Sequence, residues 1–216
     1  MSGFQAAIFD LDGVLVDSAK AHFVAWRRLA DELGIVFTEH DNEALKGLDR
    51  ITSLRTILAL GGRTVADDEM AKLAARKNGY YLDMIRQMSP ADQLPGADAL
   101  VRSARASHLK CAVASASRNA PLLLERSGLA PLIDFVADPG AIARGKPAPD
   151  IFLACSAALG VDPVACLAFE DAAAGIEAIV AAGMFAVGIG DPEILKGARI
   201  TFPTTSAVDL AALLQA

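Results

Sequence analysis

Short runs of largely apolar residues recur along the chain, separated by segments whose apolar residues have helical spacing. Uninterrupted apolar runs are typical of strands that are buried on both faces, as in a parallel sheet. Each run stops at a polar or glycine residue, so the pattern predicts four such strands. They are Ala6–Phe9, Cys111–Ala114, Cys166–Phe169 and Phe185–Ile189.

Helical spacing fills the segments between the later strands. The predicted helices are Ala97–Ser107, Pro121–Ser127, Pro149–Leu159 and Ala172–Ala182. A proline in the first turn is favourable because the missing N–H has no helical partner there, and Gly183 stands where it can end the last helix. Strands that alternate with helices predict an α/β fold, a Rossmann-like parallel sheet core with helices on both faces.

One region breaks this alternation, because it contains helical patterns and no convincing strand. It predicts a small helical cap domain at residues 16–89, inserted into a core domain formed by residues 1–15 and 90–216. Ser89-Pro90 and Pro95-Gly96 are turn signals that mark the return to the core. The helices expected in the cap are one that ends at Gly34, a second at Ile51–Leu60, and a third at Val65–Gln87 with an interruption near Gly79.

Composition narrows the class of protein. The 216 residues carry 20 basic and 26 acidic side chains, a formal charge of −6, with 53% hydrophobic and 21% charged residues. This balance excludes a disordered chain and argues against binding to nucleic acid or to anionic membranes. No apolar run approaches the ~20 residues that span a bilayer, and no secretory signal is visible. Three cysteines without metal-ligand spacing indicate reduced thiols, so we expect a cytoplasmic protein. The polar, self-contained pattern of the chain predicts a monomer.

The residues that follow the predicted strands carry the candidate chemistry. In open parallel sheets, ligands bind at the carboxyl ends of the strands. We therefore expect four carboxylates, one lysine and a hydroxyl in a single crevice. They are Asp10, Asp12, Ser115, Lys146, Glu170 and Asp171.

Clustered carboxylates raise one another's pKa unless a cation lies among them. Carboxylate oxygens suit a hard cation, and Mg²⁺ commonly takes one or two carboxylates together with waters and phosphate oxygens. Lys146 and the Ser115 hydroxyl are then placed to hold a phosphoryl group against the metal. A carboxylate nucleophile that forms an aspartyl-phosphate divides the high barrier of phosphate-ester cleavage into two steps.

Each of these residues also has an ordinary structural explanation. Asp10 and Asp12 could cap a turn, Glu170-Asp171 could cap a helix, and Lys146 could be a solvated loop residue. Together, these explanations require independent coincidences at each strand end, in the right order. The chemical interpretation is therefore favoured.

The same segments resemble the four motifs of the haloacid dehalogenase superfamily of phosphotransferases. The matching segments are Phe9–Val14, Ala114–Ser117, Gly145–Asp150 and Phe169–Asp171, and the position of the helical cap also matches. The resemblance implies that Asp10 is the nucleophile and Asp12 the general acid/base. It also implies that Mg²⁺ takes Asp10, the Asp12 carbonyl and Asp171, with a contribution from Glu170, and that Ser115 and Lys146 bind the transferring phosphoryl group.

Residues of the cap resemble one family within this superfamily, the β-phosphoglucomutases. The resemblance implies interconversion of β-glucose 1-phosphate and glucose 6-phosphate through β-glucose 1,6-bisphosphate. Small hexose phosphates and bisphosphates are then the expected partners, and Mg²⁺ the cofactor. The implied substrate- and phosphate-binding residues, besides Ser115 and Lys146, are His22, Trp26, Lys46, Gly47, Leu48, Arg50, Lys77, Asn78, Ala116, Ser117, Arg118 and Asn119.

The number of phosphate sites separates two enzyme classes. A phosphatase needs one phosphate site, whereas a mutase that passes through a bisphosphate needs two at opposite ends of its cavity. By the resemblance, Arg50, Ser117, Arg118 and Asn119 bind the phosphate that is not transferred, and His22 couples substrate binding to cap closure. A sugar-phosphate phosphatase is the alternative, and a non-enzymatic phosphosugar sensor is a more distant one. His22 and Trp26 could also be plain cap core, and Arg50 a solvated residue at a helix start.

Two positions depart from the family pattern. Arg118 stands where lysine is common, and the two cations bind phosphate differently. Asp49 stands before Arg50, where a small hydroxyl residue is common. Its carboxylate could weaken the distal phosphate site, or it could point to solvent.

Overall fold

The sheet at the centre of the core is parallel throughout. A computed structural model describes residues 3–215, so Met1, Ser2 and Ala216, which fall in the predicted core ranges, lie outside the described residues. The strand order is β3-β2-β1-β4-β5-β6, the Rossmann arrangement in which the direction of winding reverses beside the first strand. The strands are β1 Ala6–Phe9, β2 Lys110–Val113, β3 Phe135–Val136, β4 Cys166–Glu170, β5 Phe185–Ile189 and β6 Ile200–Phe202.

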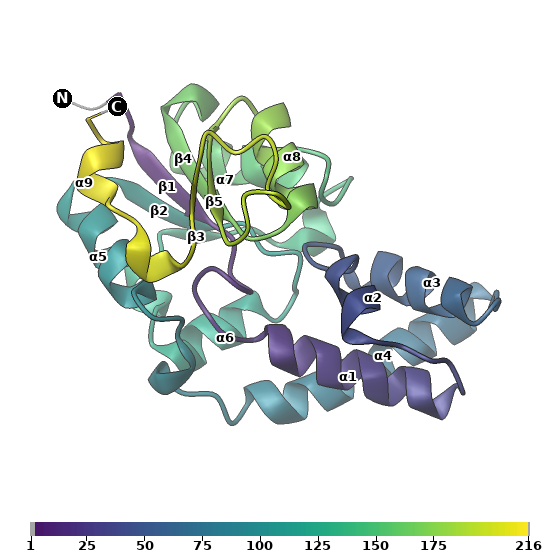
Figure 1. The fold of residues 1–216 in the computed structure, drawn as a ribbon. Coiled ribbons are helices and arrows are strands. Elements are labelled where there is room, and N and C mark those ends of the chain that lie inside the picture. Colours follow the sequence, from purple (N-terminus) through teal and green to yellow (C-terminus); the bar gives the residue numbers. More distant parts are fainter. Residues whose placement is uncertain (1–2, 216) are drawn as a thin grey trace.

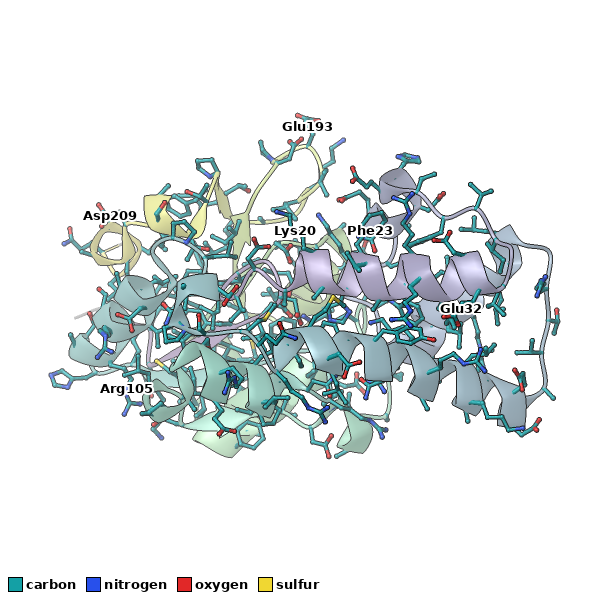
Figure 2. All side chains as sticks on the ribbon, turned by 90° about the horizontal axis from the view of Figure 1, so that it is seen from below. Lys20, Phe23, Glu32, Arg105, Glu193 and Asp209 are labelled. Carbon is teal, nitrogen blue, oxygen red and sulfur yellow. The ribbon has the colours of Figure 1, made fainter. Side chains whose placement is uncertain are left out.

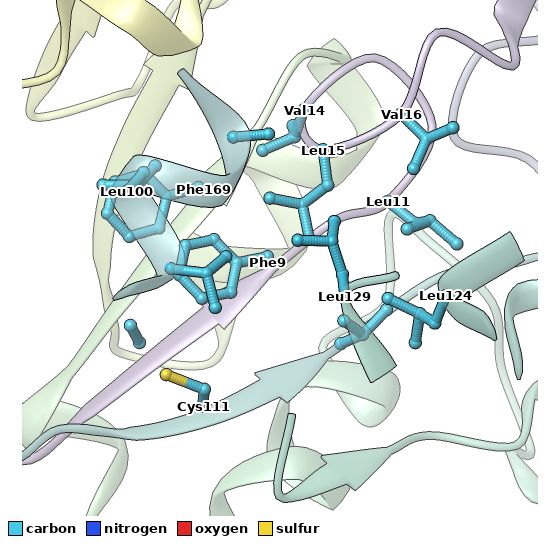
Figure 3. Close-up of a cluster of buried hydrophobic side chains, with 14 of the residues drawn as sticks. Phe9, Leu11, Val14, Leu15, Val16, Leu100, Cys111, Leu124, Leu129 and Phe169 are labelled. Atoms are coloured by element: carbon cyan, nitrogen blue, oxygen red, sulfur yellow. The ribbon is translucent and has the colours of Figure 1, made fainter. Parts of the chain in front are cut away.

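Helices cover both faces of this sheet (Figure 1). Alternate residues of β1 point to opposite faces, so Phe9 belongs to one buried cluster and Ile8 to the other. Phe9 stacks on Phe169 of β4 at 5.0 Å between ring centroids, in the cluster drawn in Figure 3. The helices on the Phe9 face are α5 Ala97–Ala106, α6 Ala120–Ser127 and α9 Leu210–Leu213, and those on the Ile8 face are α7 Asp150–Leu159 and α8 Ala173–Ala181.

The inserted segment forms a layer of helices beside the core (Figure 1). Its helices are α1 Ala19–Glu32, α2 Glu39–Glu43, α3 Arg50–Leu60 and α4 Asp67–Ile85. They have an apolar cluster of their own, which includes Trp26, Leu54 and Leu73. Figure 2 shows α1 and α4 side by side. Glu32 of α1 accepts a hydrogen bond of 2.7 Å from the Tyr80 hydroxyl of α4.

The two connections between cap and core also run side by side. Val16 pairs with Gln93, and the Asp17 N–H donates to the Asp92 carbonyl at 2.9 Å. The chain therefore crosses from core to cap and back through two adjacent segments of backbone. The predicted boundaries at residues 16 and 89 stay a prediction.

The predicted fold class is confirmed, and several element predictions need correction. The third cap helix has no interruption at Gly79, because the buried residues Met70, Leu73 and Tyr81 hold one continuous face of α4 against its neighbours. This packing outweighs the ~1 kcal/mol that a glycine costs inside a helix. The strand pattern missed β3 and β6, which are the short edge strands of the sheet. None of the helices in residues 3–215 is long and apolar enough to cross a membrane.

Candidate active site

The carboxyl ends of β1, β2 and β4 lie next to one another at one edge of the sheet. Phe9, the last residue of β1, pairs with Val113 of β2 and with Phe169 of β4. The pairing continues past the strand, since the Asp10 N–H donates to the Phe169 carbonyl at 2.9 Å. The residues that follow each strand are thereby fixed at the point where the winding of the sheet reverses, which is where open α/β sheets bind ligands.

Lys146 links two of these strand ends. It lies in the loop before α7, and its side chain has no exposed surface. Its Nζ lies 2.6 Å from Oδ1 of Asp10 and 2.8 Å from Oε2 of Glu170. Burial alone would lower the pKa of Lys146, but the two carboxylates outweigh burial and raise it. The lysine is therefore a permanent positive charge in the floor of the site.

Three carboxylates form a compact cluster around this lysine. Asp10, Glu170 and Asp171 each place an oxygen within 4.8 Å of the others. Burial, followed by the charge of Asp10, raises the pKa of Asp171 to about 7 and that of Glu170 well above its usual value. Burial, opposed by Lys146 and reinforced by Asp12, raises the pKa of Asp10. A cation bound among these carboxylates would offset their mutual repulsion and stabilise their ionised forms.

The backbone beside this cluster is shaped for close approach. A Cβ on Gly13 would lie 2.1 Å from Oδ2 of Asp171, and a Cβ on Gly175 would lie 2.0 Å from Cδ of Glu170. Both positions admit only glycine without rearrangement of the carboxylates. An all-oxygen donor set of carboxylates fits a hard divalent cation such as Mg²⁺.

Asp12 has different surroundings from Asp10. Its carboxylate accepts hydrogen bonds from the hydroxyls of Ser18, of Ser115 at 3.3 Å and of Tyr81 at 3.4 Å. Nε2 of His22 lies 3.6 Å from its Oδ1. Burial raises the pKa of Asp12, but hydrogen bonds and charge from His22, Ser18 and Ser115 outweigh it and lower the pKa to about 2. The side chain of Asp12 is thus ionised and faces the cap, where it can exchange a proton with a bound molecule.

A buried lysine and a histidine extend from Asp12 into the cap. Nζ of Lys77 lies 2.9 Å from Nδ1 of His22, and also 4.4 Å and 4.7 Å from the ring centroids of Trp26 and Tyr81. Burial, followed by the charge of Arg50, lowers the pKa of Lys77 to about 7. Burial and the neighbouring Lys77 also lower the pKa of His22. Trp26 is at once part of the cap core and a wall of this polar pocket.

Arg50 occupies the first position of α3, on the cap side of the site. Burial, followed by the positive charge of Arg118, lowers its pKa. Two cations from the cap and the core therefore face the same space. The Asp49 carboxylate caps α3 by accepting from the N–H groups of Ile51 at 2.8 Å and Thr52 at 3.1 Å. Its effect on a distal phosphate stays a prediction.

Asn78 joins the cap to the loop after β2. Its side-chain oxygen accepts a hydrogen bond of 2.9 Å from the amide of Asn119. The Asn119 N–H in turn donates to the Ser117 hydroxyl at 3.2 Å. Asn78 therefore contacts a predicted binding residue, but Asn78 itself does not line the cavity between cap and core.

A cavity of about 530 Å³ lies between cap and core. In the described part of the chain, residues 3–215, the predicted site residues Ser115 and Glu170 do not line this cavity. Tyr81, Ser53 and Asn42 do line it, and the sequence interpretation missed them. Tyr81 is four residues after Lys77 on α4, so helical spacing could have found it. The predicted residues that line the cavity are Asp10, Asp12, His22, Trp26, Lys46, Gly47, Leu48, Arg50, Lys77, Ala116, Ser117, Arg118, Asn119, Lys146 and Asp171.

Comparisons with known proteins agree with this architecture. The family model of the haloacid dehalogenase-like hydrolases matches residues 4–183. A β-phosphoglucomutase from Bacillus subtilis is 43% identical over 97% of this chain and 93% of its own length. The crystal structure of a β-phosphoglucomutase from Clostridium difficile superposes with a TM-score of 0.95 at 39% identity, over 98% of this chain and 96% of that one.

A phosphatase is also similar. The fructose-1-phosphate phosphatase of Escherichia coli is 32% identical over 86% of this chain and 96% of its own length. The similarity to the mutases is thus greater in identity and in coverage of this chain than the similarity to this phosphatase.

Proposed function

The chain belongs to the haloacid dehalogenase-like hydrolase family, alongside its β-phosphoglucomutase relatives, and on that premise we propose how its residues act. The reaction is the interconversion of β-D-glucose 1-phosphate and D-glucose 6-phosphate. It proceeds through β-glucose 1,6-bisphosphate and a phosphorylated Asp10. Each half-reaction moves one phosphoryl group between a sugar oxygen and the Asp10 carboxylate.

The observation that carries this proposal is the presence of two charged ends in one cavity. Asp10, Lys146, Arg50 and Arg118 all line this cavity, and we assign the pair Asp10 and Lys146 to one end and the pair Arg50 and Arg118 to the other. A bisphosphate has two anionic groups and needs both ends at once. A phosphatase that removes a single phosphate does not require the second pair of cations.

Asp10 is proposed as the nucleophile, because its carboxylate lines the cavity beside the lysine that neutralises a phosphoryl oxygen. An Asp10 oxygen bonds to phosphorus as the bond from phosphorus to the sugar oxygen breaks. Bound Mg²⁺, held by Asp10, Asp171, Glu170 and the Asp12 backbone, would neutralise the charge on the phosphoryl oxygens. Lys146 keeps Asp10 oriented and adds a fixed positive charge at the point of transfer.

Asp12 is proposed as the general acid/base. The ionised carboxylate first takes a proton from the sugar hydroxyl that attacks phospho-Asp10, and it returns that proton to the sugar oxygen that leaves in the next transfer. Ser18, Ser115 and Tyr81 hold its carboxylate in place. His22 and Lys77 lie on the cap side of Asp12, where they would contact the sugar when the cap is closed.

The distal phosphate is proposed to lie between Arg50 and Arg118, with Ser117 and Asn119 as further donors. Arginine binds phosphate through paired, charge-assisted hydrogen bonds. After the first transfer, the intermediate turns so that its other phosphate faces Asp10. The two arginines are then required to hold either phosphate in turn.

A sugar-phosphate phosphatase remains the second candidate, favoured by the similar phosphatase from Escherichia coli. In that case water rather than a sugar hydroxyl accepts the phosphoryl group from Asp10. The choice of glucose as the hexose, the monomeric state and the cytoplasmic location stay predictions.

Phosphorus NMR of the purified protein tests the proposal directly. The sample contains Mg²⁺, β-glucose 1-phosphate and a trace of β-glucose 1,6-bisphosphate. We expect the glucose 1-phosphate signal to be replaced by glucose 6-phosphate, with little inorganic phosphate. Stoichiometric release of inorganic phosphate would instead establish the phosphatase.

A further inference from the structure

A second hollow adjoins the substrate cavity, and the proposed reaction does not use it. We call it the rear groove, and its volume is about 800 Å³. It runs between the α2–α3 connection of the cap and the start of α8 in the core. Among the residues that line it are Gly13, Glu43, Lys46, Leu48, Asp171 and Ala173.

The α2–α3 connection separates this groove from the substrate cavity. Figure 1 shows the connection reaching from the cap to the core, where a Cβ on Gly47 would lie 3.3 Å from Cβ of Ala172. Lys46, Leu48 and Asp171 line both spaces. These three residues are therefore a shared wall, with the sugar cavity on one side and the groove on the other.

Asp171 belongs to the Asp10–Glu170–Asp171 cluster and also lines the groove. In the part of the chain that the structure describes, Asp10 and Glu170 are not among the lining residues of the groove. Its Oδ2 lies against Gly13, which lines the groove but not the sugar cavity. The groove thus reaches the carboxylate cluster through Gly13 and Asp171, without passing Asp10 and Lys146, which line the sugar cavity.

The size and charge of the groove suit a hydrated cation. Mg²⁺ dehydrates reluctantly and keeps several waters; six waters at about 30 Å³ each fill about 180 Å³. Glu43, Asp171 and Asp191 outnumber Lys46 along the lining, and Lys46 is held by Glu43 at 2.8 Å. The excess of negative charge raises the local concentration of cations.

From this arrangement we propose that the rear groove is the route by which the divalent metal reaches and leaves Asp171 while a sugar phosphate occupies the main cavity. The inference rests on the metal assignment in the proposed function. It adds that metal exchange and substrate exchange use separate openings. A closed cap with a bound sugar phosphate therefore does not trap the metal.

Substituting a bulky residue in the groove tests this route. Ala173→Trp places an indole at the exposed first position of α8, and Thr204→Trp places one in the segment after β6 that lines the same groove. Neither residue belongs to the proposed catalytic or binding machinery. Ala181→Trp is the matched control, because Ala181 is on the same helix and is absent from both linings as described for residues 3–215.

The measurement is the exchange of Mn²⁺, an oxygen-preferring ion detectable by electron paramagnetic resonance. Association and dissociation rates are recorded by rapid mixing, with the protein free and saturated with glucose 6-phosphate. We expect metal exchange in the wild-type protein to persist at saturating glucose 6-phosphate. Ala173→Trp and Thr204→Trp should slow both rates by at least about tenfold in the saturated protein, while Ala181→Trp leaves them unchanged.

A blocked route has a signature that damage to the site lacks. The equilibrium constant is the ratio of the two rates, so a higher barrier on the path slows both and leaves the Kd for Mn²⁺ unchanged. If glucose 6-phosphate stops exchange in the wild-type protein, or if both groove variants exchange at the wild-type rate, the route is overturned and the metal assignment stands. If Mn²⁺ does not bind the wild-type protein at all, the metal assignment and the route both fail.

Discussion

The two ends of the substrate cavity carry opposite excess charge and are built in different ways. At the core end, the carboxylates of Asp10, Glu170 and Asp171 cluster beside a single lysine, Lys146, which bonds to the first two, so acidic groups outnumber basic ones. At the distal end, Arg50 and Arg118 face the same space and the charge is positive. One end is completed by a cation and the other by an anion.

Because the two ends are built from different parts of the chain, only the distal end requires a residue of the cap for its assembly. The core end consists of residues fixed by adjacent strands of one buried sheet, and Lys146 holds two of them together without any ligand. The distal end takes Arg50 from the start of α3 and Arg118 from the loop after β2, so it exists only when cap and core are together. Repulsion between the two arginines opposes that state until an anion lies between them. The comparison predicts that changes at the core end abolish chemistry, whereas changes at the distal end affect the mutase reaction selectively.

Replacement of Asp10 should have the largest effect. Asp10→Asn removes the nucleophile and one negative charge from the metal cluster, because an amide neither attacks phosphorus nor binds a hard cation as well. We expect mutase turnover to fall by at least about 10⁴-fold, measured by coupling glucose 6-phosphate formation to a dehydrogenase. Mass spectrometry verifies that the variant has not deamidated. Substantial turnover by a verified Asp10→Asn protein would remove Asp10 from its role.

Truncation at the distal end should separate two reactions of the same enzyme. Arg50→Ala removes a charge-assisted grip on phosphate, a loss that typically costs ~2–5 kcal/mol. Transfer between bisphosphate and enzyme needs that grip, whereas hydrolysis of phospho-Asp10 by water does not. We therefore expect the ratio of mutase rate to phosphoenzyme-hydrolysis rate to fall by at least about 30-fold.

Arg50→Lys serves as the control for this prediction, since it keeps the charge and should recover part of the mutase rate. An equal loss of both rates would indicate a destabilised cap. An unchanged mutase rate would place the second phosphate site elsewhere and strengthen the phosphatase candidate.

Metal binding at the core end should depend on pH. The pKa of Asp171 is raised from 3.8 to about 7, so the folded protein holds a proton there that the unfolded chain releases near pH 4. The metal-free protein should therefore lose stability as pH rises from about 4 through 7. A metal must displace the same proton, so apparent Mg²⁺ affinity should rise about tenfold between pH 6 and 8.

Calorimetric titration with Mg²⁺ and thermal melting with and without a chelator measure these two effects. The stabilisation by saturating Mg²⁺ should grow over the same pH range. Asp171→Asn should weaken binding and reduce the pH dependence between pH 6 and 8. A pH-independent affinity in the wild-type protein would contradict the description of the core end as an unbalanced carboxylate cluster.

Loss of the bond between cap and core at Asn78 should be mild and confined to the distal end. Asn78→Ala removes the hydrogen bond that holds the Asn119 amide, and one such bond contributes ~1 kcal/mol. We expect about a fivefold higher KM for the bisphosphate with little change in phosphoenzyme hydrolysis. Asn78→Asp keeps an acceptor for the Asn119 amide and should restore much of the affinity. A loss confined to kcat would show that Asn78 acts on the chemical step instead.

Asp49 should matter least for activity, although it adjoins Arg50. As the cap of α3 its carboxylate interacts with backbone N–H groups, so Asp49→Ala should cost ~1 kcal/mol of stability. Asp49→Ser, which keeps a capping oxygen, should recover most of it. The KM for bisphosphate should change less than twofold in both variants. A clear gain in bisphosphate affinity would mean that the carboxylate repels the distal phosphate after all.

The local sequence pattern does not predict the edge strands of the sheet or the shortest helix of the cap. The central strands β1 and β5 were predicted at their observed bounds, because burial on both faces leaves an uninterrupted apolar run. The edge strands β3 and β6 pair on one side only, so little sequence signal specifies them. Glu39–Glu43 forms a short helix because Thr38 and Asp41 cap it reciprocally, a spacing that was present in the sequence but overlooked.

The sequence by itself determined the chemistry of the core end. Asp10, Lys146 and Asp171 follow predicted strands or precede a predicted helix, and the topology of a parallel sheet brings strand ends together without further information. Only the tertiary structure decided the link between Asn78 and Asn119 and the position of Tyr81 against Asp12. Those contacts join the cap to the core. Their geometry follows from how two packed units fit together, and short-range spacing along the chain carries no record of that fit.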